Sequence, residues 1–299
     1  RNRLKKGLGT LSCDKLERRQ RKTDSGGGKM EVTNLTVLGA GTMGNGIAHV
    51  ASLSGLDVLL LDISEEVLDR ALATIRKNME RQMKKELIGS DEMVRALKRI
   101  RTSLSLEEAR TSQVVVEAVV EAEQVKKDLF KRLDEICPAE TVLATNTSSI
   151  PITAIAAATK RPEKVIGMHF MNPVPVMQLV EIIKGLATSD ETFSTVEGLA
   201  KRLGKTPVLV NDSPGFVSNR VLMPMINEAV YCLMEGVADR EAIDTVMKLG
   251  MNHPMGPLAL ADLIGLDVCL VVLEVLHRDL GAPKYRPCPL LRKMVRAGF

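Results

Sequence analysis

The chain has 299 residues, 45% hydrophobic and 26% charged, with a net charge of +4, a composition that is ordinary for a soluble globular protein. No apolar run reaches the roughly 18 residues that a membrane helix needs, which excludes a membrane-spanning protein. Five cysteines are scattered without a C-x-x-C pair and four histidines do not cluster, so we expect no disulfide framework and no metal site. This cysteine usage predicts a reducing intracellular compartment, and it leaves cytoplasm, peroxisome and mitochondrial matrix open.

The positive charge is concentrated at the N-terminus. Residues 1–29 hold ten Lys/Arg and three acidic residues, a net +7, which leaves −3 on residues 30–299. This segment has few large apolar residues and ends in Ser25-Gly26-Gly27-Gly28, a flexible linker composition. Such a tail can bind nucleic acid or act in targeting, but it has no aromatic residues for base stacking. We therefore predict a disordered basic extension over 1–29, no nucleic-acid partner, and a natural start near Met30.

From Asn34 onward, short apolar runs alternate with helical stretches. Strands that alternate with helices predict a mostly parallel sheet covered on both faces, a doubly wound α/β fold. The runs predicted as buried strands are 35–38, 58–61, 114–119, 141–144, 165–168, 179–183 and 207–210. The helical stretches between them include 43–53, 65–87, 123–136 and 190–203.

The character of the chain changes after residue 211. Between Pro214 and Val295 the helical periodicity is broken by Gly and Pro, and no strand pattern stands out. We predict two domains, an α/β domain over 30–211 and an all-helical domain over 212–299.

A glycine-rich hexapeptide, G-A-G-T-M-G, occupies positions 39–44 directly after the first predicted strand and opens the first helix. In this context G-x-G-x-x-G is typical of dinucleotide binding. Gly39 permits a tight turn, Gly41 lets the backbone approach a pyrophosphate, and Gly44 allows close helix–strand packing. The helix N-terminus offers N–H groups and a partial positive charge to the phosphates. The predicted cofactor-binding residues of this loop are Gly39, Gly41, Thr42, Met43 and Gly44.

Asp62 follows the second predicted strand, 18 residues beyond Gly44. A carboxylate at this position accepts hydrogen bonds from the adenosine ribose hydroxyls and repels the extra phosphate of NADP. The sequence therefore predicts a Rossmann-type domain that binds NAD.

His169 follows the predicted strand 165–168, and Glu181 interrupts the apolar run 179–183. Histidine is the usual base for removing a hydroxyl proton near neutral pH, and the carboxyl ends of parallel strands face the ligand crevice. A carboxylate in a buried strand needs a partner, which an imidazole would supply while being oriented in turn. This favours a His169–Glu181 dyad, with a backbone-bonded core histidine and a solvent-facing edge glutamate as the alternatives.

Two further polar clusters stand out. Asn146-Thr147-Ser148-Ser149 follows the predicted strand 141–144, and a segment around Asn219 opens the helical domain. Ser148 and Asn219 could both hydrogen-bond a substrate oxygen. Equally, Ser148 could cap a helix over 150–158, and Asn219 could cap or face solvent.

Taken together, the motifs become specific. Six motifs stand in order along the chain: LGAGTMGNGIA (38–48), VEAVVE (116–121), TNTSS (145–149), GMHFMNPVPVM (167–177), LVEI (179–182) and DSPGFVSNR (212–220). With these motifs in this order, the chain closely resembles the L-3-hydroxyacyl-CoA dehydrogenase family, particularly its short-chain 3-hydroxybutyryl-CoA dehydrogenases, over residues 33–299.

The resemblance implies roles for individual residues. It implies that His169 is the catalytic base and Glu181 its orienting partner. Ser148 and Asn219 resemble the residues that hold the substrate's 3-oxygen, with Ser148 also near the nicotinamide. Lys85, in a basic helix segment, resembles a lysine that meets the CoA phosphates, although a solvated helix face is the alternative. Further positions implied to contact NAD are Glu121, Lys126, Asn146 and Asn172.

The expected activity is reversible, NAD-dependent oxidation of an (S)-3-hydroxyacyl-CoA to a 3-oxoacyl-CoA, in fatty-acid or butanoate metabolism, by a homodimer formed through the helical domain. Family members continue beyond the position of Phe299 into a Lys/Gly-rich segment, so we expect the helical domain to be shortened here. The alternatives are a sugar-acid (gulonate-type) dehydrogenase of the same superfamily and a catalytically silent NAD-binding protein. Acyl chain length and physiological direction stay open.

Overall fold

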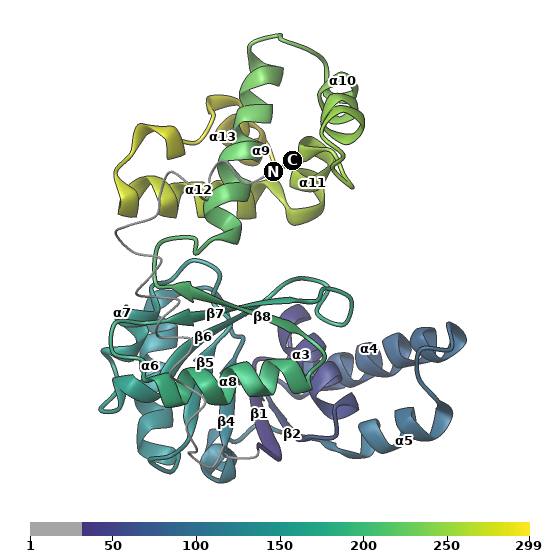
Figure 1. Cartoon of the computed structure of the whole chain (residues 1–299), viewed down its shortest axis with the longest axis vertical. Coiled ribbons are helices and arrows are strands. Elements are labelled where there is room, and N and C mark those ends of the chain that lie inside the picture. The colour runs from purple at the N-terminus through teal and green to yellow at the C-terminus, as the bar shows by residue number, and fades with distance from the viewer. Residues whose placement is uncertain (1–31) are drawn as a thin grey trace, which may run out of the picture. The chain divides into compact units, whose positions relative to one another are not determined.

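The computed structural model describes residues 32–299, so the predicted basic tail 1–29 lies outside the described residues. Eight strands form a single sheet in the order β3-β2-β1-β4-β5-β6-β7-β8 (Figure 1). Their bounds are β1 (Asn34–Leu38), β2 (Asp57–Leu61), β3 (Ile100–Ser103), β4 (Val114–Glu117), β5 (Val142–Thr145), β6 (Val165–Phe170), β7 (Leu179–Lys184) and β8 (Thr206–Asn211).

The sheet is mostly parallel, as predicted. All neighbouring strands pair in parallel except β6 and β7, which are antiparallel. The chain builds outward from β1 to β3 on one side and then returns to place β4 beside β1. The strand order therefore reverses between β1 and β4, the position at which open α/β sheets bind ligands beyond the carboxyl ends of their strands.

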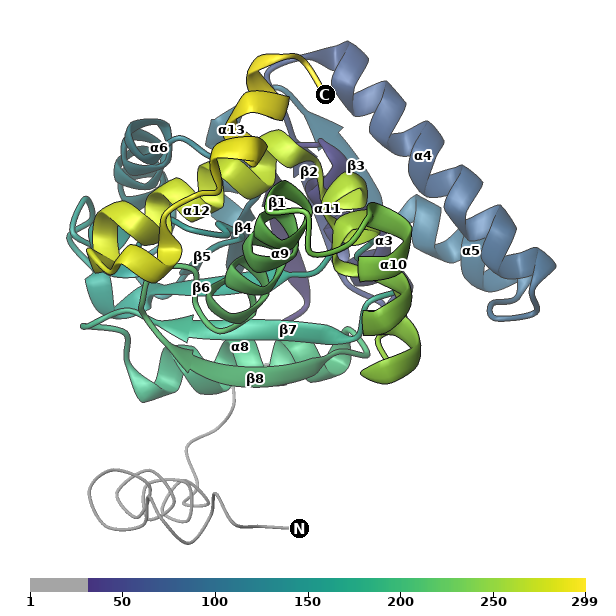
Figure 2. The same cartoon turned by 90° about the horizontal axis from the view of Figure 1, so that it is seen from above.

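Helices cover both faces of the sheet, because strand residues alternate between two hydrophobic cores. Val114 and Val116 of β4 pack in the core formed with α3, α4, α5 and α8, whereas Val115 packs in the core formed with α6 and α7. Figure 2 shows α8 against β7 and β8 at one edge of the sheet. These helices and two short 3₁₀ turns are α3 (Thr42–Leu53), α4 (Glu65–Lys84), α5 (Ser90–Lys98), η1 (Leu106–Thr111), α6 (Glu123–Ile136), α7 (Ile152–Ala156), η2 (Pro162–Lys164) and α8 (Asp190–Arg202).

The segment after β8 is helical throughout the described chain, as predicted, and has its own core around Ile226, Leu273 and Leu291. Its elements are α9 (Ser218–Met234), α10 (Arg240–Thr245), η3 (Val246–Gly250), α11 (Pro257–Ile264), α12 (Leu266–Leu280), η4 (Pro283–Tyr285) and α13 (Pro289–Arg296). Within residues 32–299, no helix combines the length and apolarity needed to cross a membrane.

The two largest differences from the sequence prediction lie within residues 65–103. The predicted helix 65–87 ends at Lys84, where Glu86 takes a left-handed backbone conformation with φ of 57°, and a second helix, α5, follows. Strand β3 is absent from the prediction because its residues, Ile100–Ser103, form no apolar run. It pairs with β2 at the edge of the sheet, where its side chains are only partly buried, so its sequence has no hydrophobic pattern typical of a buried strand.

Candidate active site

The glycine loop joins β1 to α3 and shapes a space for a ligand. Gly39 has a φ of +91°, and a Cβ on Gly44 would lie 1.7 Å from the Gly39 carbonyl oxygen, so neither position accepts another residue. A Cβ on Gly41 would meet nothing within 4 Å, which is the open surface that a pyrophosphate needs. Among the described residues, no side chain caps the N-terminus of α3 at Gly41. The loop and the helix end therefore fit a dinucleotide phosphate.

Asp62 lies directly after β2 and is tied to the glycine loop. Its Oδ2 accepts a hydrogen bond of 2.7 Å from the backbone N–H of Ala40, and its Oδ1 accepts one of 2.7 Å from Ile63. The carboxylate is partly exposed, and the side chain of Ile63 beside it is 97% exposed. Asp62 is therefore held beside the loop with room for a ribose.

His169 and Glu181 face one another because the antiparallel register of β6 and β7 pairs them directly. The His169 Nδ1 lies 2.9 Å from the Glu181 Oε2, and the two residues are 7% and 2% exposed. An ionised Glu181 makes Nδ1–H the donor in this bond, so the lone pair on Nε2 is available to accept a proton. The Phe216 ring packs at a centroid distance of 5.7 Å from the imidazole.

Glu181 also holds the start of the helical segment. Its Oε1 accepts hydrogen bonds from the backbone N–H groups of Val217 (3.1 Å) and Ser218 (3.0 Å), and its Oε2 accepts one from the Ser218 hydroxyl (2.8 Å). Burial by itself raises the pKa of Glu181, but the bonds from His169 and Ser218 outweigh it and hold the pKa below the usual 4.5. Glu181 is thus an anion that fixes both the imidazole and the first residues of α9.

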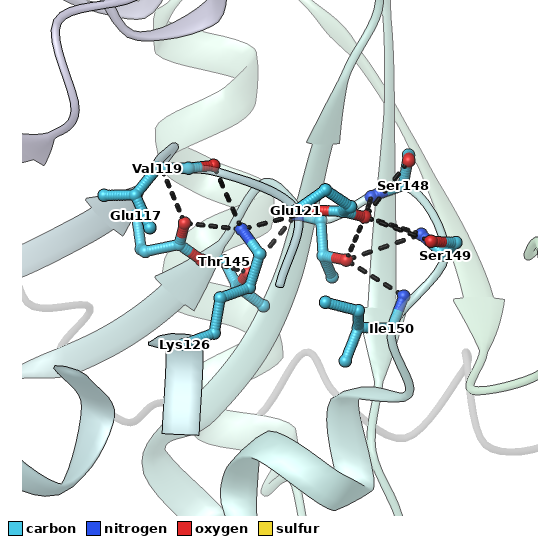
Figure 3. A network of polar contacts seen from close by, with 9 residues as sticks. Glu117, Val119, Glu121, Lys126, Thr145, Ser148, Ser149 and Ile150 are labelled. Atoms are coloured by element: carbon cyan, nitrogen blue, oxygen red, sulfur yellow. Dashed lines mark hydrogen bonds and ion pairs between the residues drawn. The ribbon is translucent and has the colours of Figure 1, made fainter. Parts of the chain in front are cut away.

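Ser148 lies in the loop after β5, where Glu121 gathers the neighbouring donors (Figure 3). The Glu121 Oε1 accepts hydrogen bonds from the backbone N–H of Ser148 (2.8 Å), the Ser148 hydroxyl (3.1 Å) and the Thr147 hydroxyl (2.6 Å), as well as from Ser149. Burial raises the pKa of Glu121, but the Lys126 ammonium and these hydrogen bonds hold it below its usual value. The Asn219 amide donates to the Ser148 carbonyl oxygen at 3.1 Å. The structure therefore brings Ser148, Asn219 and Glu121 together.

The remaining predicted residues differ in their surroundings. Asn146 accepts a hydrogen bond of 2.9 Å from the backbone N–H of Phe170, which links the end of β5 to β6 beside His169. Lys126 is buried, with its side chain 1% exposed, and its ammonium forms ion pairs. Asn172 and Lys85 are exposed, and Lys85 caps the C-terminus of α4. Within the described chain, no hydrogen bond or ion pair joins Lys85 or Asn172 to the other predicted residues.

Ser148 does not cap the following helix, which was one alternative for it. Helix α7 begins only at Ile152, and its first N–H groups, on Ile152 and Thr153, donate to the two oxygens of Asp212. Asp212 is 59 or more residues away in the chain, so local sequence gives no sign of this cap. Three other residues of the site were not assigned from the sequence, Glu117, Thr147 and Ser218, although each stands inside one of the motifs quoted above.

The sequence comparisons agree on one family. Residues 34–213 match the family model described as "3-hydroxyacyl-CoA dehydrogenase, NAD binding domain", and residues 215–299 match "3-hydroxyacyl-CoA dehydrogenase, C-terminal domain". A "Probable 3-hydroxybutyryl-CoA dehydrogenase" of Bacillus subtilis is 58% identical over 270 residues, 90% of this chain and 94% of its own. The human mitochondrial "Hydroxyacyl-coenzyme A dehydrogenase" is 43% identical over 274 residues, 89% of this chain and 87% of its own.

Solved structures agree with these matches. The crystal structure of (S)-3-hydroxybutyryl-CoA dehydrogenase from Ralstonia eutropha superposes with a TM-score of 0.88 at 49% identity, over 90% of this chain and 95% of that one. The likeness therefore spans both the sheet and the helical segment.

Proposed function

The chain belongs to the 3-hydroxyacyl-CoA dehydrogenase family, and from this premise we propose that it catalyses the reversible, NAD-dependent oxidation of a short-chain (S)-3-hydroxyacyl-CoA to the 3-oxoacyl-CoA, as part of fatty-acid or butanoate metabolism. The observation that carries this proposal is the 2.9 Å contact between His169 Nδ1 and Glu181 Oε2, in a chain whose glycine loop has the geometry that a dinucleotide needs.

His169 is the base in the proposed reaction. Its Nε2 takes the proton of the substrate's 3-hydroxyl, and the imidazolium that forms is stabilised by the Glu181 carboxylate on the opposite ring nitrogen. In the reverse direction His169 returns this proton to the 3-oxygen. Because Glu181 is an anion held by Ser218 and by two backbone N–H groups, Nδ1 keeps its proton and the ring keeps its orientation while Nε2 gains and loses the substrate's proton.

Ser148 and Asn219 hold the substrate in this proposal. Both lie beside the same loop, and the Ser148 hydroxyl donates to Glu121 through a bond of 3.1 Å, a length that leaves it ready to turn toward a substrate oxygen. Bound NAD supplies the acceptor for the hydride that leaves C3. Around it, Gly41 and the N-terminus of α3 would hold the pyrophosphate, and Asp62 the adenosine ribose.

The direct test is oxidation of NADH with acetoacetyl-CoA, compared with acetoacetate and with a 3-oxo sugar acid. We expect turnover with acetoacetyl-CoA and a loss of at least about tenfold in kcat/KM without the CoA moiety, because binding energy from remote groups assists the chemical step. Comparable rates with free acetoacetate would contradict a CoA-binding site at the basic C-terminal end of α4, where Lys85 is exposed. Faster turnover of the sugar acid would favour the alternative dehydrogenase.

We also propose that the protein is a homodimer joined through its helical domain. This domain exposes several large apolar side chains, among them Leu249 (81%), Leu263 (70%) and Met251 (60%). Exposed apolar residues in such number are typical of interaction surfaces. Sedimentation of the wild type should give a dimer at micromolar concentration, and Leu263→Asp should weaken it. The control Leu186→Asp, at a 90% exposed position of the α/β domain, should not. A wild-type monomer would overturn the proposal.

A further inference from the structure

Glu117 is a completely buried carboxylate at the end of β4, and each of its oxygens has a strong partner. Its Oε1 lies 2.6 Å from the Lys126 ammonium and accepts a hydrogen bond of 2.7 Å from the backbone N–H of Val119. Its Oε2 accepts a bond of 2.6 Å from the Thr145 hydroxyl at the end of β5. Glu117 therefore joins the ends of two neighbouring strands at the carboxyl edge of the sheet (Figure 3).

Lys126 lies between this buried carboxylate and the exposed part of the site. Its Nζ is 3.3 Å from the Glu121 Oε2 as well as 2.6 Å from Glu117, and only 1% of its side chain is exposed. A buried ammonium is stable only with such partners, since its desolvation is otherwise costly. Glu117, the nearer and more deeply buried of the two carboxylates, therefore offsets much of the cost of burying Lys126 beside Glu121.

Glu121 completes the connection to the substrate loop. About a third of its side chain (35%) is exposed, and its second oxygen, Oε1, accepts the donors of residues 147–149. One carboxylate thus contacts the buried lysine through Oε2 and the Ser148 loop through Oε1. The path from Glu117 to Ser148 is continuous, with contacts of 2.6, 3.3 and 2.8 Å.

We propose that Glu117 is a positioning residue for the reaction: through Lys126 it fixes the Glu121 carboxylate, and through that carboxylate it sets the position of Ser148. This inference rests on the proposed function, in which Ser148 holds the substrate oxygen. Lys126 acts here by orienting Glu121 from inside the domain. Thr145, at the end of β5, also helps to position this loop. Its hydroxyl donates a hydrogen bond to Glu117, and the same hydroxyl oxygen accepts one of 3.2 Å from the backbone N–H of Thr147.

A second buried ion pair on the same helix supplies a matched control. Asp134, also on α6, pairs with Arg161 at 2.6 Å, and their side chains are 7% and 10% exposed. Its other oxygen accepts the backbone N–H of Lys160, and Arg161 also donates to the Cys137 carbonyl oxygen. None of these partners belongs to the candidate site. Removing either carboxylate costs stability, but only removal of Glu117 should alter Ser148.

The first experiment measures hydrogen exchange at single amides in Glu117→Gln, Asp134→Asn and wild type. Ser148 and Ser149 donate their backbone N–H groups to Glu121, so we expect their protection to fall in Glu117→Gln by more than that of the central sheet amides. In Asp134→Asn the loss should instead fall on the Lys160 amide. If the protection of Ser148 and Ser149 relative to the central sheet amides is unchanged in Glu117→Gln, the proposal is overturned. This outcome does not depend on which substrate the enzyme uses.

The second experiment is a double-mutant cycle on kcat/KM for acetoacetyl-CoA. Glu117→Gln should lower it about tenfold or more, since misplacing a reacting group by an ångström can cost about a hundredfold. The same change in a Ser148→Ala background should cost less than about threefold, because the hydroxyl that it positions is absent. NADH affinity, measured separately by fluorescence, shows how much of the loss comes from cofactor binding, since Lys126 and Glu121 are also positions implied to contact NAD. A purely structural role lowers the folded fraction equally in both backgrounds, so equal losses would overturn the proposal.

A third variant keeps the test valid if Glu117→Gln folds poorly. Glu117→Gln combined with Lys126→Met removes both charges, which a buried site tolerates better than one charge alone. We expect its thermal stability to recover toward wild type while kcat/KM stays low. Recovery of both would show that the pair is structural. Activity of the wild type with acetoacetyl-CoA tests the proposed function separately. Failure of the proposed function can therefore be distinguished from failure of the positioning role of Glu117.

Discussion

Two carboxylates of the site, Glu181 and Glu121, accept similar sets of hydrogen bonds in different surroundings. Glu181 lies within a strand and is 2% exposed, and its partners come from the adjacent strand and from the start of α9. Glu121 lies in the loop after β4, about a third of its side chain is exposed, and its Oε1 partners all come from residues 147–149.

This difference in burial decides how freely each carboxylate can exchange partners. Water cannot replace a lost partner at a buried carboxylate, so Glu181 holds the His169 ring in a single orientation. Water or a ligand can replace a partner at the exposed edge of Glu121. Under the proposed function, this difference in burial predicts a rigid base at His169 and an adaptable substrate donor at Ser148.

The largest effect is expected at the rigid carboxylate. Glu181→Gln should lower kcat by roughly 10² or more, the scale of lost general-base assistance, because the ring loses its orienting anion. His169→Ala should cost at least as much, and the double variant should lose little more, since the two residues act as one unit. Steady-state kinetics with separate NADH titrations measure this. If the losses of kcat in the two single variants add up in the double variant, His169 and Glu181 act independently. Glu191→Gln, at an exposed ion pair, is the control.

The carboxylate of Asp62 extends the comparison to the cofactor. Because it is partly exposed and held by two backbone N–H groups, we expect it to repel the extra phosphate of NADP and to favour NAD by about tenfold or more. Asp62→Ala with Ile63→Arg should relax or invert this preference, since residue 63 is exposed enough to accept an arginine. The measurement is kcat/KM for both cofactors. Equal use of NAD and NADP by the wild type would refute this role.

A smaller effect should come from the Ser218 hydroxyl, which shares the Glu181 Oε2 with His169. Ser218→Ala leaves the backbone N–H bond in place, so it should lower the free energy of unfolding by about 1 kcal/mol and kcat only a few-fold. Urea unfolding and steady-state kinetics measure the two quantities. Thr195→Ala, whose hydroxyl donates to a carbonyl of its own helix, is the control. A change in kcat as large as that of Glu181→Gln would mean that Ser218 itself takes part in the chemistry.

The smallest effect concerns acid stability. The pKa values of Glu181 and Glu121 lie below their unfolded value of 4.5, so their contribution to stability is complete above that pH and is lost as the pH falls through the folded values. Glu181→Gln should therefore lose less stability than wild type between about pH 5 and about pH 3, although it is less stable at neutral pH. Urea midpoints across this range test it. Parallel curves for both proteins would show that Glu181 does not titrate in this interval.

Much of the fold could be predicted because short stretches of sequence indicate its strands and helices. Alternating apolar runs and helical stretches predicted seven of the strands, and the missed one, Ile100–Ser103, is the edge strand without an apolar run. The glycine loop is equally local, because steric limits at Gly39 and Gly44 act within a few residues.

The sequence by itself determined which residue types stand near the strand ends: Asp62 and Ser148 lie in the segments that follow β2 and β5, and His169 lies near the end of β6. Only the tertiary structure decided how they pair. The antiparallel register of β6 and β7 sets His169 opposite Glu181, and α6 carries Lys126 inward to lie between Glu117 and Glu121. Such pairings depend on which strands become neighbours and on which charged side chains are buried together. Neither leaves a periodic pattern in the sequence of a single chain.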